Sequence, residues 1–264
     1  MTALTVCLLN CHRPQSIAEL VPVLANQSIK PKIFLWNNGE KFKGDEPFLR
    51  HITWLVESSE NRKFWPRWMM AAHAETDFVC SWDDDLKPRD PDLFRDVLLV
   101  YHELQLTGAV GPFGVGFIKD EPYESCHHHK ANKMMATMPK SKWKLVPKAP
   151  REARRQKIRF FRREASRTMV APVDMIKGRH LLLPRRELLD HVSSWEKDNG
   201  EDDIKICGGV AGGLPGKHNV LAVYNNRFVD TDTPEDVDSA HAWSRRKGHS
   251  AKRQKARELF FPGL

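Results

Sequence analysis

The sequence predicts an α/β protein built on a mostly parallel central sheet. Short, continuous apolar runs at residues 3–9, 33–36 and 78–82 have the length of strands that are buried on both faces. Between the first two runs, apolar residues recur at the spacing of one helix face, as in Ile17, Leu20, Val21 and Leu24. Alternating strands and helices favour βαβ units, in which the strands run parallel.

The first half of the chain continues this alternation. A further strand is expected at residues 52–56, and a helix over about residues 61–75, with Pro66 in its first turns, where proline is tolerated. Asp90 is suited to cap the next helix, with Pro91 at its first position. Because ligands of such sheets bind beyond the carboxyl ends of the strands, we expect the polar residues that follow these runs to converge: Asn10, Asn37, Asn38 and the acidic residues 83–85.

The second half is less regular. Residues 173–178 lead into a strand at 181–183 and a helix from about 185 to 195. Residues 199–203 open another helix, with Ile204 and Cys207 facing inward, and a last strand is expected at 219–224. We therefore expect a single domain over residues 1–264, with residues 119–170 as a basic insertion and 244–264 as a basic C-terminal tail.

The basic character of the chain is local. The whole chain carries 42 Lys and Arg against 34 Asp and Glu, a net charge of +8. Residues 140–167 alone hold twelve of these cations against two Glu, so this segment is +10 and the rest of the chain sums to −2. With Trp143, Phe160 and Phe161 interleaved, the segment is suited to a phosphate backbone and stacked bases. An anionic lipid or polysaccharide would be attracted equally, and a solvated basic helix is the alternative.

The composition argues against a membrane-spanning protein and against a disulfide framework. No apolar run approaches the roughly 20 residues that span a bilayer, and the first residues lack the basic stretch of a signal peptide. The five cysteines include no Cys-x-x-Cys pair, which favours reduced thiols. We therefore expect a cytoplasmic protein, in the host cytoplasm if the chain is viral.

Three carboxylates, those of Asp83, Asp84 and Asp85, end the strand at 78–82. Adjacent carboxylates repel one another and resist losing water unless positive charge lies between them. Mg²⁺ or Mn²⁺ takes oxygen ligands and leaves positions open for phosphate oxygens. This stretch is therefore a candidate metal–phosphate site, and the alternative is a polar loop before a helix.

Five motifs follow one another along the chain. They are Asn-x-x-Arg at 10–13, Asn-Asn-Gly at 37–39, Asn-Arg at 61–62, Asp-x-Asp at 83–85 and Gly-Glu-Asp-Asp at 200–203. This ordered set resembles the GT-A fold of nucleotide-sugar-dependent glycosyltransferases, a Rossmann-like domain, and is most similar to glycosyltransferase family 2. The resemblance covers roughly residues 3–110 and 172–224. The chain also has some likeness to exostosin-type glycosyltransferases, which retain configuration.

The resemblance implies a metal-dependent glycosyltransferase that moves a hexose from a nucleoside-diphosphate sugar to an acceptor hydroxyl. A UDP-sugar is the first candidate for the donor. Asp83 would hold the donor ribose or metal-bound water, Asp84 would face the sugar or ribose, and Asp85 would ligate the Mn²⁺ or Mg²⁺ that bridges the diphosphate. Four residues would line the nucleotide pocket: Asn10, Arg13, Asn38 and Arg62. A solvated surface arginine is the alternative for Arg13 and Arg62.

The resemblance also implies a base among Glu201, Asp202 and Asp203. An inverting transfer needs a carboxylate that takes the proton of the acceptor hydroxyl. Asp202 fits the second position of the family's Glu-Asp pair and is the first candidate, with Asp203 second; helix capping is the alternative. Because family members often add a late histidine as a metal or phosphate ligand, His241 and His249 are candidates.

The basic segment predicts a polyanionic acceptor. The binding candidates are Lys144, Arg154, Arg155, Arg159, Arg162 and Arg163. The preferred acceptor is DNA that carries a hydroxymethylated base, as for glycosyltransferases of bacteriophage, with the base flipped or presented on a single strand. The alternatives are transfer to an envelope glycan or lipid, a sugar-phosphate nucleotidyltransferase and a non-catalytic nucleic-acid-binding protein.

Overall fold

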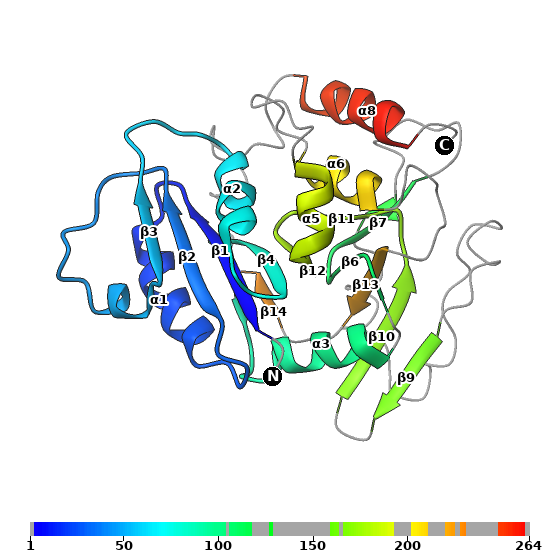
Figure 1. Ribbon diagram of the computed structural model, residues 1–264, viewed down its shortest axis with the longest axis horizontal. Helices are drawn as coiled ribbons and strands as arrows, with labels where there is room; N and C mark the ends of the chain where they lie inside the picture. Colours follow the sequence, from blue (N-terminus) through cyan, green and yellow to red (C-terminus); the bar gives the residue numbers. More distant parts are fainter. Residues whose placement is uncertain are drawn as a thin grey trace.

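A nine-stranded sheet runs through the molecule (Figure 1). The structure, a computed structural model, describes residues 3–103, 106–117, 127–128, 159–163, 166–192, 202–210, 220–224, 228–230 and 248–261. The strand order is β3 (Trp54–Glu57), β2 (Lys32–Asn37), β1 (Leu4–Asn10), β4 (Phe78–Asp83), β12 (His180–Pro184), β6 (Ala109–Gly111), β13 (Val220–Tyr224), β10 (Ser166–Pro172) and β9 (Arg159–Arg163).

Seven of the nine strands run in one direction. β1 is parallel to β2 and β4, and β2 is parallel to β3. β12 is antiparallel to both β4 and β6, so β6 and its parallel partner β13 run the same way as β4. β10 is antiparallel to β13 and to β9. Only β12 and β10 are therefore reversed, which confirms the predicted mostly parallel sheet.

The apolar runs form the strands that the sequence predicts. All seven residues of β1 are buried, because β1 lies between two parallel neighbours and both of its faces are covered. The expected strands at 33–36, 52–56 and 78–82 appear as β2, β3 and β4, and the last expected strand, at 219–224, appears as β13. The expected strand at 181–183 is β12, whose reversed direction the sequence pattern did not reveal.

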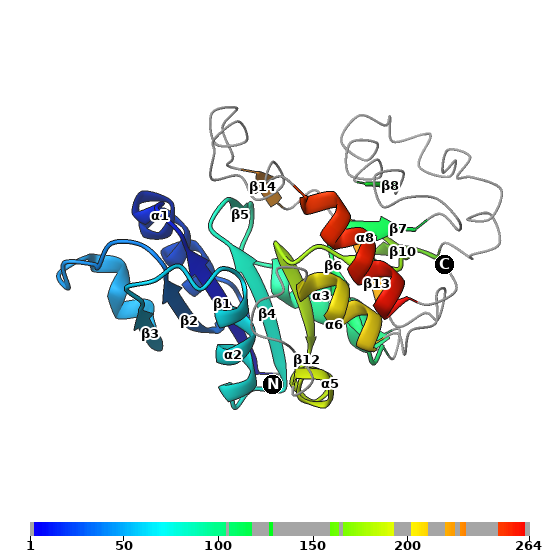
Figure 2. The same cartoon turned by 90° about the horizontal axis from the view of Figure 1, so that it is seen from above.

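Helices cover both faces of the sheet (Figures 1 and 2). On one face α1 (Pro14–Ala25) and α3 (Leu93–Glu103) bury apolar side chains against Val6, Leu8 and Trp82 of the sheet, and the 3-10 helix η1 (Pro47–His51) adds Phe48. On the other face Cys7, Val79 and Leu181 contribute to a second apolar cluster. That cluster includes residues of α2 (Trp65–His73), α5 (Arg185–Val192), α6 (Asp202–Val210) and α8 (His249–Phe260).

Helix α2 begins later than the expected residue 61. The side chain of Asn38 holds the preceding loop: its Oδ1 accepts a bond from Arg62 N (2.9 Å) and its Nδ2 donates to the carbonyl of Lys63 (3.2 Å). Lys63 has a φ of 58°, in the left-handed region that ends regular helix. These contacts keep residues 61–64 outside the helix, and Pro66 lies at its first positions.

Two small sheets flank the main one. β5 (Leu86–Pro88) pairs with β14 (Phe228–Asp230), directly after the acidic end of β4. β7 (Gly114–Gly116) lies between β11 (Met175–Ile176) and β8 (His127–His128). Within the described parts of the chain, no helix has both the length and the apolar character to cross a membrane.

Candidate functional site

Three asparagines lie where β1 and β2 end. Asn10 and Asn37 are partners in the parallel register, and Asn10 Nδ2 donates to Asn37 Oδ1 (2.8 Å). Asn10 Oδ1 in turn accepts from Arg13 N (3.1 Å), and Asn37 Oδ1 accepts from Gly39 N (3.0 Å). The expected convergence of these strand ends is present. The side-chain amides of Asn10 and Asn37 hold the loops that follow β1 and β2.

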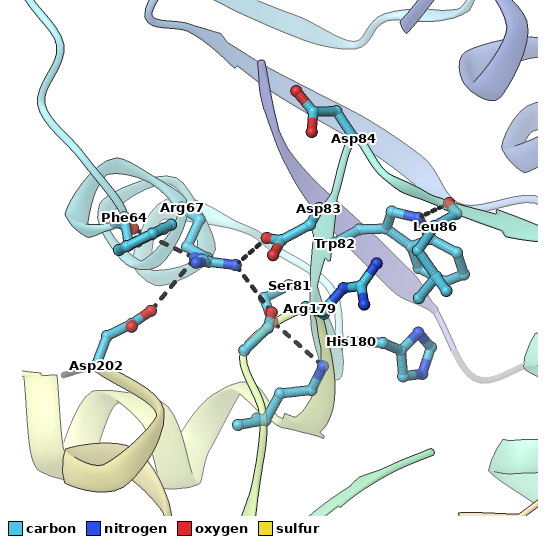
Figure 3. Close-up of polar contacts among 12 residues, drawn as sticks. Phe64, Arg67, Ser81, Trp82, Asp83, Asp84, Leu86, Arg179, His180 and Asp202 are labelled. Atoms are coloured by element: carbon cyan, nitrogen blue, oxygen red, sulfur yellow. Dashed lines mark hydrogen bonds and ion pairs between the residues drawn. The ribbon is translucent and has the colours of Figure 1, made fainter. Parts of the chain in front are cut away.

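The three carboxylates at the end of β4 face three different arginines. Asp83 accepts from Arg67 Nη1 (2.6 Å). Asp85 pairs with Arg179 Nη2 (2.9 Å). Asp84 accepts from Cys11 N (3.3 Å) and lies 3.5 Å from Arg13, and it points away from Arg67 (Figure 3). Each carboxylate thus has a positively charged arginine partner. On sequence alone, a metal ion is the expected compensation for these charges.

The donor chemistry of this strand end fits a hard divalent cation, because carboxylate oxygens are the ligands that Mg²⁺ and Mn²⁺ prefer. The side chains of Asp83 and Asp85 are 21% and 15% exposed, so a hydrated ion can reach both. The described residues contain no cluster of three or more metal-binding side chains. Arg179 is also partly exposed, at 21%, so its ion pair with Asp85 lies within reach of an incoming ligand.

Arg67 connects the end of β4 to helix α6 (Figure 3). Its side chain is buried; Nη1 bonds Asp83, and Nε lies 3.3 Å from Asp202 Oδ2. Trp68 Nε1 donates to the same Asp202 oxygen (2.5 Å). Burial raises the pKa of Asp202, and the guanidinium of Arg67 partly offsets that rise.

Asp203, the next residue, has a different environment. Its Oδ2 accepts from Arg253 of α8 (3.1 Å), and its Oδ1 accepts from Ile204 N (2.9 Å). Burial opposes ionisation of Asp203, but Arg253 and these hydrogen bonds outweigh it and hold its pKa below the ordinary value. The two neighbouring carboxylates are therefore divided between two arginines from different helices.

Lys177 and His249 lie close to the Asp203–Arg253 pair. Burial, together with the positive charges of Arg253 and Arg179, lowers the pKa of Lys177 to about 8. Burial and Arg253 also lower the pKa of His249, and Asp203 acts on it in the opposite direction. The proposed metal role of His249 stays a prediction.

The remaining candidate residues are placed as follows. Arg62 is exposed and pairs with Glu60 (2.8 Å), and its backbone joins it to Asn38. Arg159, Arg162 and Arg163 lie on β9, the last strand of the sheet order, and their side chains are outside the described part of the structure. The other candidates lie outside the described residues: Glu201, His241, Lys144, Arg154 and Arg155.

Sequence reasoning missed Arg67, Arg179 and Arg253. A signal for Arg67 exists, because Arg67, Met70 and Ala71 are spaced i, i+3, i+4 and all are buried, so a charged residue lies on the buried face of α2. A cation on such a face needs a carboxylate partner. Arg253 has the same signal, because Arg253, Ala256 and Arg257 are spaced i, i+3, i+4 and are all buried in α8. For Arg179 the local sequence offers no comparable signal, because its partner Asp85 is 94 residues away in the chain.

Comparison with known proteins gives a similarity of structure. No known protein family and no curated protein matches this sequence. Among solved structures, S. aureus TarS 1-349 in complex with UDP is similar over 98% of this chain and 70% of that chain, with 12% sequence identity and a TM-score of 0.52. A longer S. aureus TarS structure has a TM-score of 0.49 at 12% identity, and this chain spans 44% of its length. The similarity confirms the predicted α/β fold of the GT-A type.

Proposed function

We propose that this protein is a glycosyltransferase that moves a sugar from a nucleoside-diphosphate sugar to an acceptor hydroxyl. One observation carries the proposal: a buried arginine joins the carboxylate end of β4 to a second carboxylate, Asp202, at the start of α6. Donor binding and proton removal need two acidic groups near each other at the ligand-binding edge of the sheet. The arrangement of Asp83 and Asp202 around Arg67 supports this pair of roles.

Asp202 is the proposed base. The acceptor oxygen forms a bond to the anomeric carbon, the bond from that carbon to the diphosphate breaks with its electron pair, and Asp202 takes the hydroxyl proton. The raised pKa of Asp202 suits this task better than the lowered pKa of Asp203, because a stronger base takes a proton more readily. A single base and a single displacement give inversion of configuration, which is the stereochemistry we propose.

The proposed donor is a UDP-sugar. The UDP in the TarS complex supports this choice, since the two proteins share a fold. We assign the donor-binding role to Asp83 and Asp84, together with Asn10, Arg13, Asn38 and Arg62. Arg13 and Arg62 can meet phosphate oxygens through charge-assisted hydrogen bonds.

We further propose that Mn²⁺ or Mg²⁺ takes part, held by Asp85 and Asp83. When bound, the ion supplies positive charge beside the leaving diphosphate. Arg179, the partner of Asp85, carries the same sign of charge at the same place in its absence. His249 and His241 are further proposed ligands.

The proposed acceptor is a polyanion, with hydroxymethylated DNA as the first candidate. The +10 charge of residues 140–167 supports a polyanion of either nucleic acid or envelope-glycan type. Three buried cysteines, Cys7, Cys80 and Cys207, are reduced thiols in the described part of the structure, which supports a reducing compartment such as the cytoplasm.

The experiment is release of nucleoside diphosphate from a panel of nucleotide sugars. Reactions contain Mn²⁺, Mg²⁺ or EDTA, with hydroxymethylated DNA, with anionic glycan or without acceptor. We expect acceptor-stimulated, metal-dependent release from one donor, and a loss of about 10² to 10⁴-fold in Asp202→Asn, the range for a general base. Asp190→Asn, the same substitution at an exposed residue of α5, is the matched control and should retain full activity.

Other outcomes separate the alternatives. Failure of every donor to give nucleoside diphosphate with any acceptor would refute the glycosyltransferase. Pyrophosphate formed from a nucleoside triphosphate and a sugar phosphate would instead favour a nucleotidyltransferase. Transfer to DNA that is unchanged between low and physiological salt would refute the polyanion-binding role of the basic segment.

A further inference from the structure

Arg67 is a buried cation between two carboxylates that come from separate elements. It lies in the first half of α2 with 2% of its side chain exposed, between Asp83 of β4 and Asp202 of α6. Its two other hydrogen bonds go to backbone carbonyls: Nη1 donates to Gly178 O (2.8 Å) and Nε donates to Phe64 O (3.4 Å). The guanidinium also lies over the rings of Phe64 and Trp68. The guanidinium is thus surrounded by acceptors from four segments of the chain.

The shape of the guanidinium matters for this arrangement. Its donors form a rigid planar fork, so bonding Asp83 through Nη1 fixes the direction in which Nε faces Asp202. A lysine carries the same charge at a single point on a flexible stem and cannot reproduce both directions. Arg67 therefore sets the distance and orientation between the two carboxylates as well as their charge balance.

The surroundings of Asp202 make Arg67 its main positive neighbour. Asp83 of β4 and Asp203 of α6 are negative and disfavour ionisation of Asp202, whereas Arg67 and the indole N–H of Trp68 favour it. Two other cations, Arg253 of α8 and Lys177 after β11, act on Asp203. Without Arg67, the Asp202 carboxylate would be a buried anion beside two others.

We propose that Arg67 is a positioning residue that joins the donor-binding carboxylate Asp83 to the proton-accepting carboxylate Asp202. This inference rests on the proposed function. Arg67 holds Asp202 ionised before the acceptor arrives, and it fixes the carboxylate relative to the end of β4, where the donor binds. Neither carboxylate can move without changing the contacts that Arg67 makes with the other.

The test compares the pH dependence of kcat/KM for nucleoside diphosphate release in Arg67→Gln, Arg67→Lys and wild type. An opposite charge at this distance lowers a carboxyl pKa by about 1 to 3 units. Loss of the charge in Arg67→Gln should therefore move the acidic midpoint upward by about one unit or more. Arg67→Lys keeps the charge but not the fork, so its midpoint should stay near that of wild type while kcat falls about tenfold or more.

The matched control is Arg95→Gln on α3. Arg95 also contacts two carboxylates, Asp92 and Asp96, but it is 48% exposed, and its replacement should leave the midpoint unchanged. A purely structural role of Arg67 would lower activity in both Arg67 variants without moving the midpoint. An unchanged midpoint in Arg67→Gln therefore overturns the inference.

A measurement without turnover separates this inference from the proposed function. The carboxyl ¹³C signal of Asp202, assigned with Asp202→Asn, is titrated in wild type and in each variant. If wild type releases no nucleoside diphosphate, the proposed function fails, and the titration still tests the link between Arg67 and Asp202. Equal Asp202 titrations in wild type and Arg67→Gln overturn that link.

Trp68→Phe keeps the experiment informative if Arg67→Gln does not fold. This substitution removes the 2.5 Å bond to Asp202 without changing charge, so a smaller upward shift of the Asp202 titration is expected. The two variants then separate the causes of the Asp202 pKa. Arg67→Lys keeps the positive charge beside Asp202, and Trp68→Phe removes only a hydrogen bond to it. An Asp202 titration that Arg67→Lys shifts as far upward as Trp68→Phe does, or further, overturns the inference.

Discussion

Replacing His180 with Phe should make the protein more resistant to acid. His180 is fully buried on β12, where its ring stacks on Phe94 at an interplanar angle of 15° and meets Trp82 edge-on at 4.7 Å. Burial lowers the pKa of His180 from 6.5 to about 3, because the charged imidazolium would lose its hydration there. A phenyl ring can keep both aromatic contacts without the titrating group.

The sign of the effect follows from proton binding. Between pH 6.5 and about 3 the unfolded chain binds a proton at His180 that the folded protein does not, so stability falls as the pH is lowered through this window. One pKa unit corresponds to about 1.4 kcal/mol, so the loss reaches about 2 kcal/mol at pH 5 and about 5 kcal/mol below pH 3. His180→Phe should remove this contribution.

The assay is urea unfolding of wild type and His180→Phe at several pH values between 7.5 and 5. Other groups titrate in the same window, so the quantity of interest is the difference in unfolding free energy between the two proteins. We expect this difference to shift in favour of the variant by about 2 kcal/mol between pH 7.5 and pH 5. A constant difference for His180→Phe would refute the reasoning.

Two further predictions concern the support of α6. Arg253→Met should cost about 3 to 5 kcal/mol of stability, because it leaves the buried carboxylate of Asp203 without its guanidinium. The double variant with Asp203→Asn should cost less than the sum of the two single changes. Additive costs in urea unfolding would contradict a coupled pair. Gly208→Ala should cost about 1 to 3 kcal/mol, because the added Cβ would lie 2.7 Å from Phe260 Cβ and force α6 and α8 apart. Gly116→Ala, whose added Cβ would have its nearest neighbour at 4.0 Å, is the control, and equal thermal stability of the two alanine variants would contradict this account.

The strands and most helices could be predicted because their signals are local. β1 is a continuous apolar run because both of its faces are buried, and that condition can be read from seven consecutive residues. The start of α2 was predicted too early, because the side chain of Asn38, more than twenty residues upstream, holds the loop before it. The reversed direction of β12 also had no local signal, since a buried strand has the same apolar run in either direction.

The candidate site divides in the same way. The sequence by itself determined where the carboxylates lie along the chain, because strand ends and helix starts are local features: Asp83 to Asp85 after β4, and Asp202 and Asp203 at the start of α6. Only the tertiary structure decided which cation faces each of them. Arg67 and Asp202 are 135 positions apart in the chain, and Arg179 and Asp85 are 94 apart. An ion pair between residues so distant in sequence depends on how the helices pack on the sheet, and no periodicity in the chain encodes it.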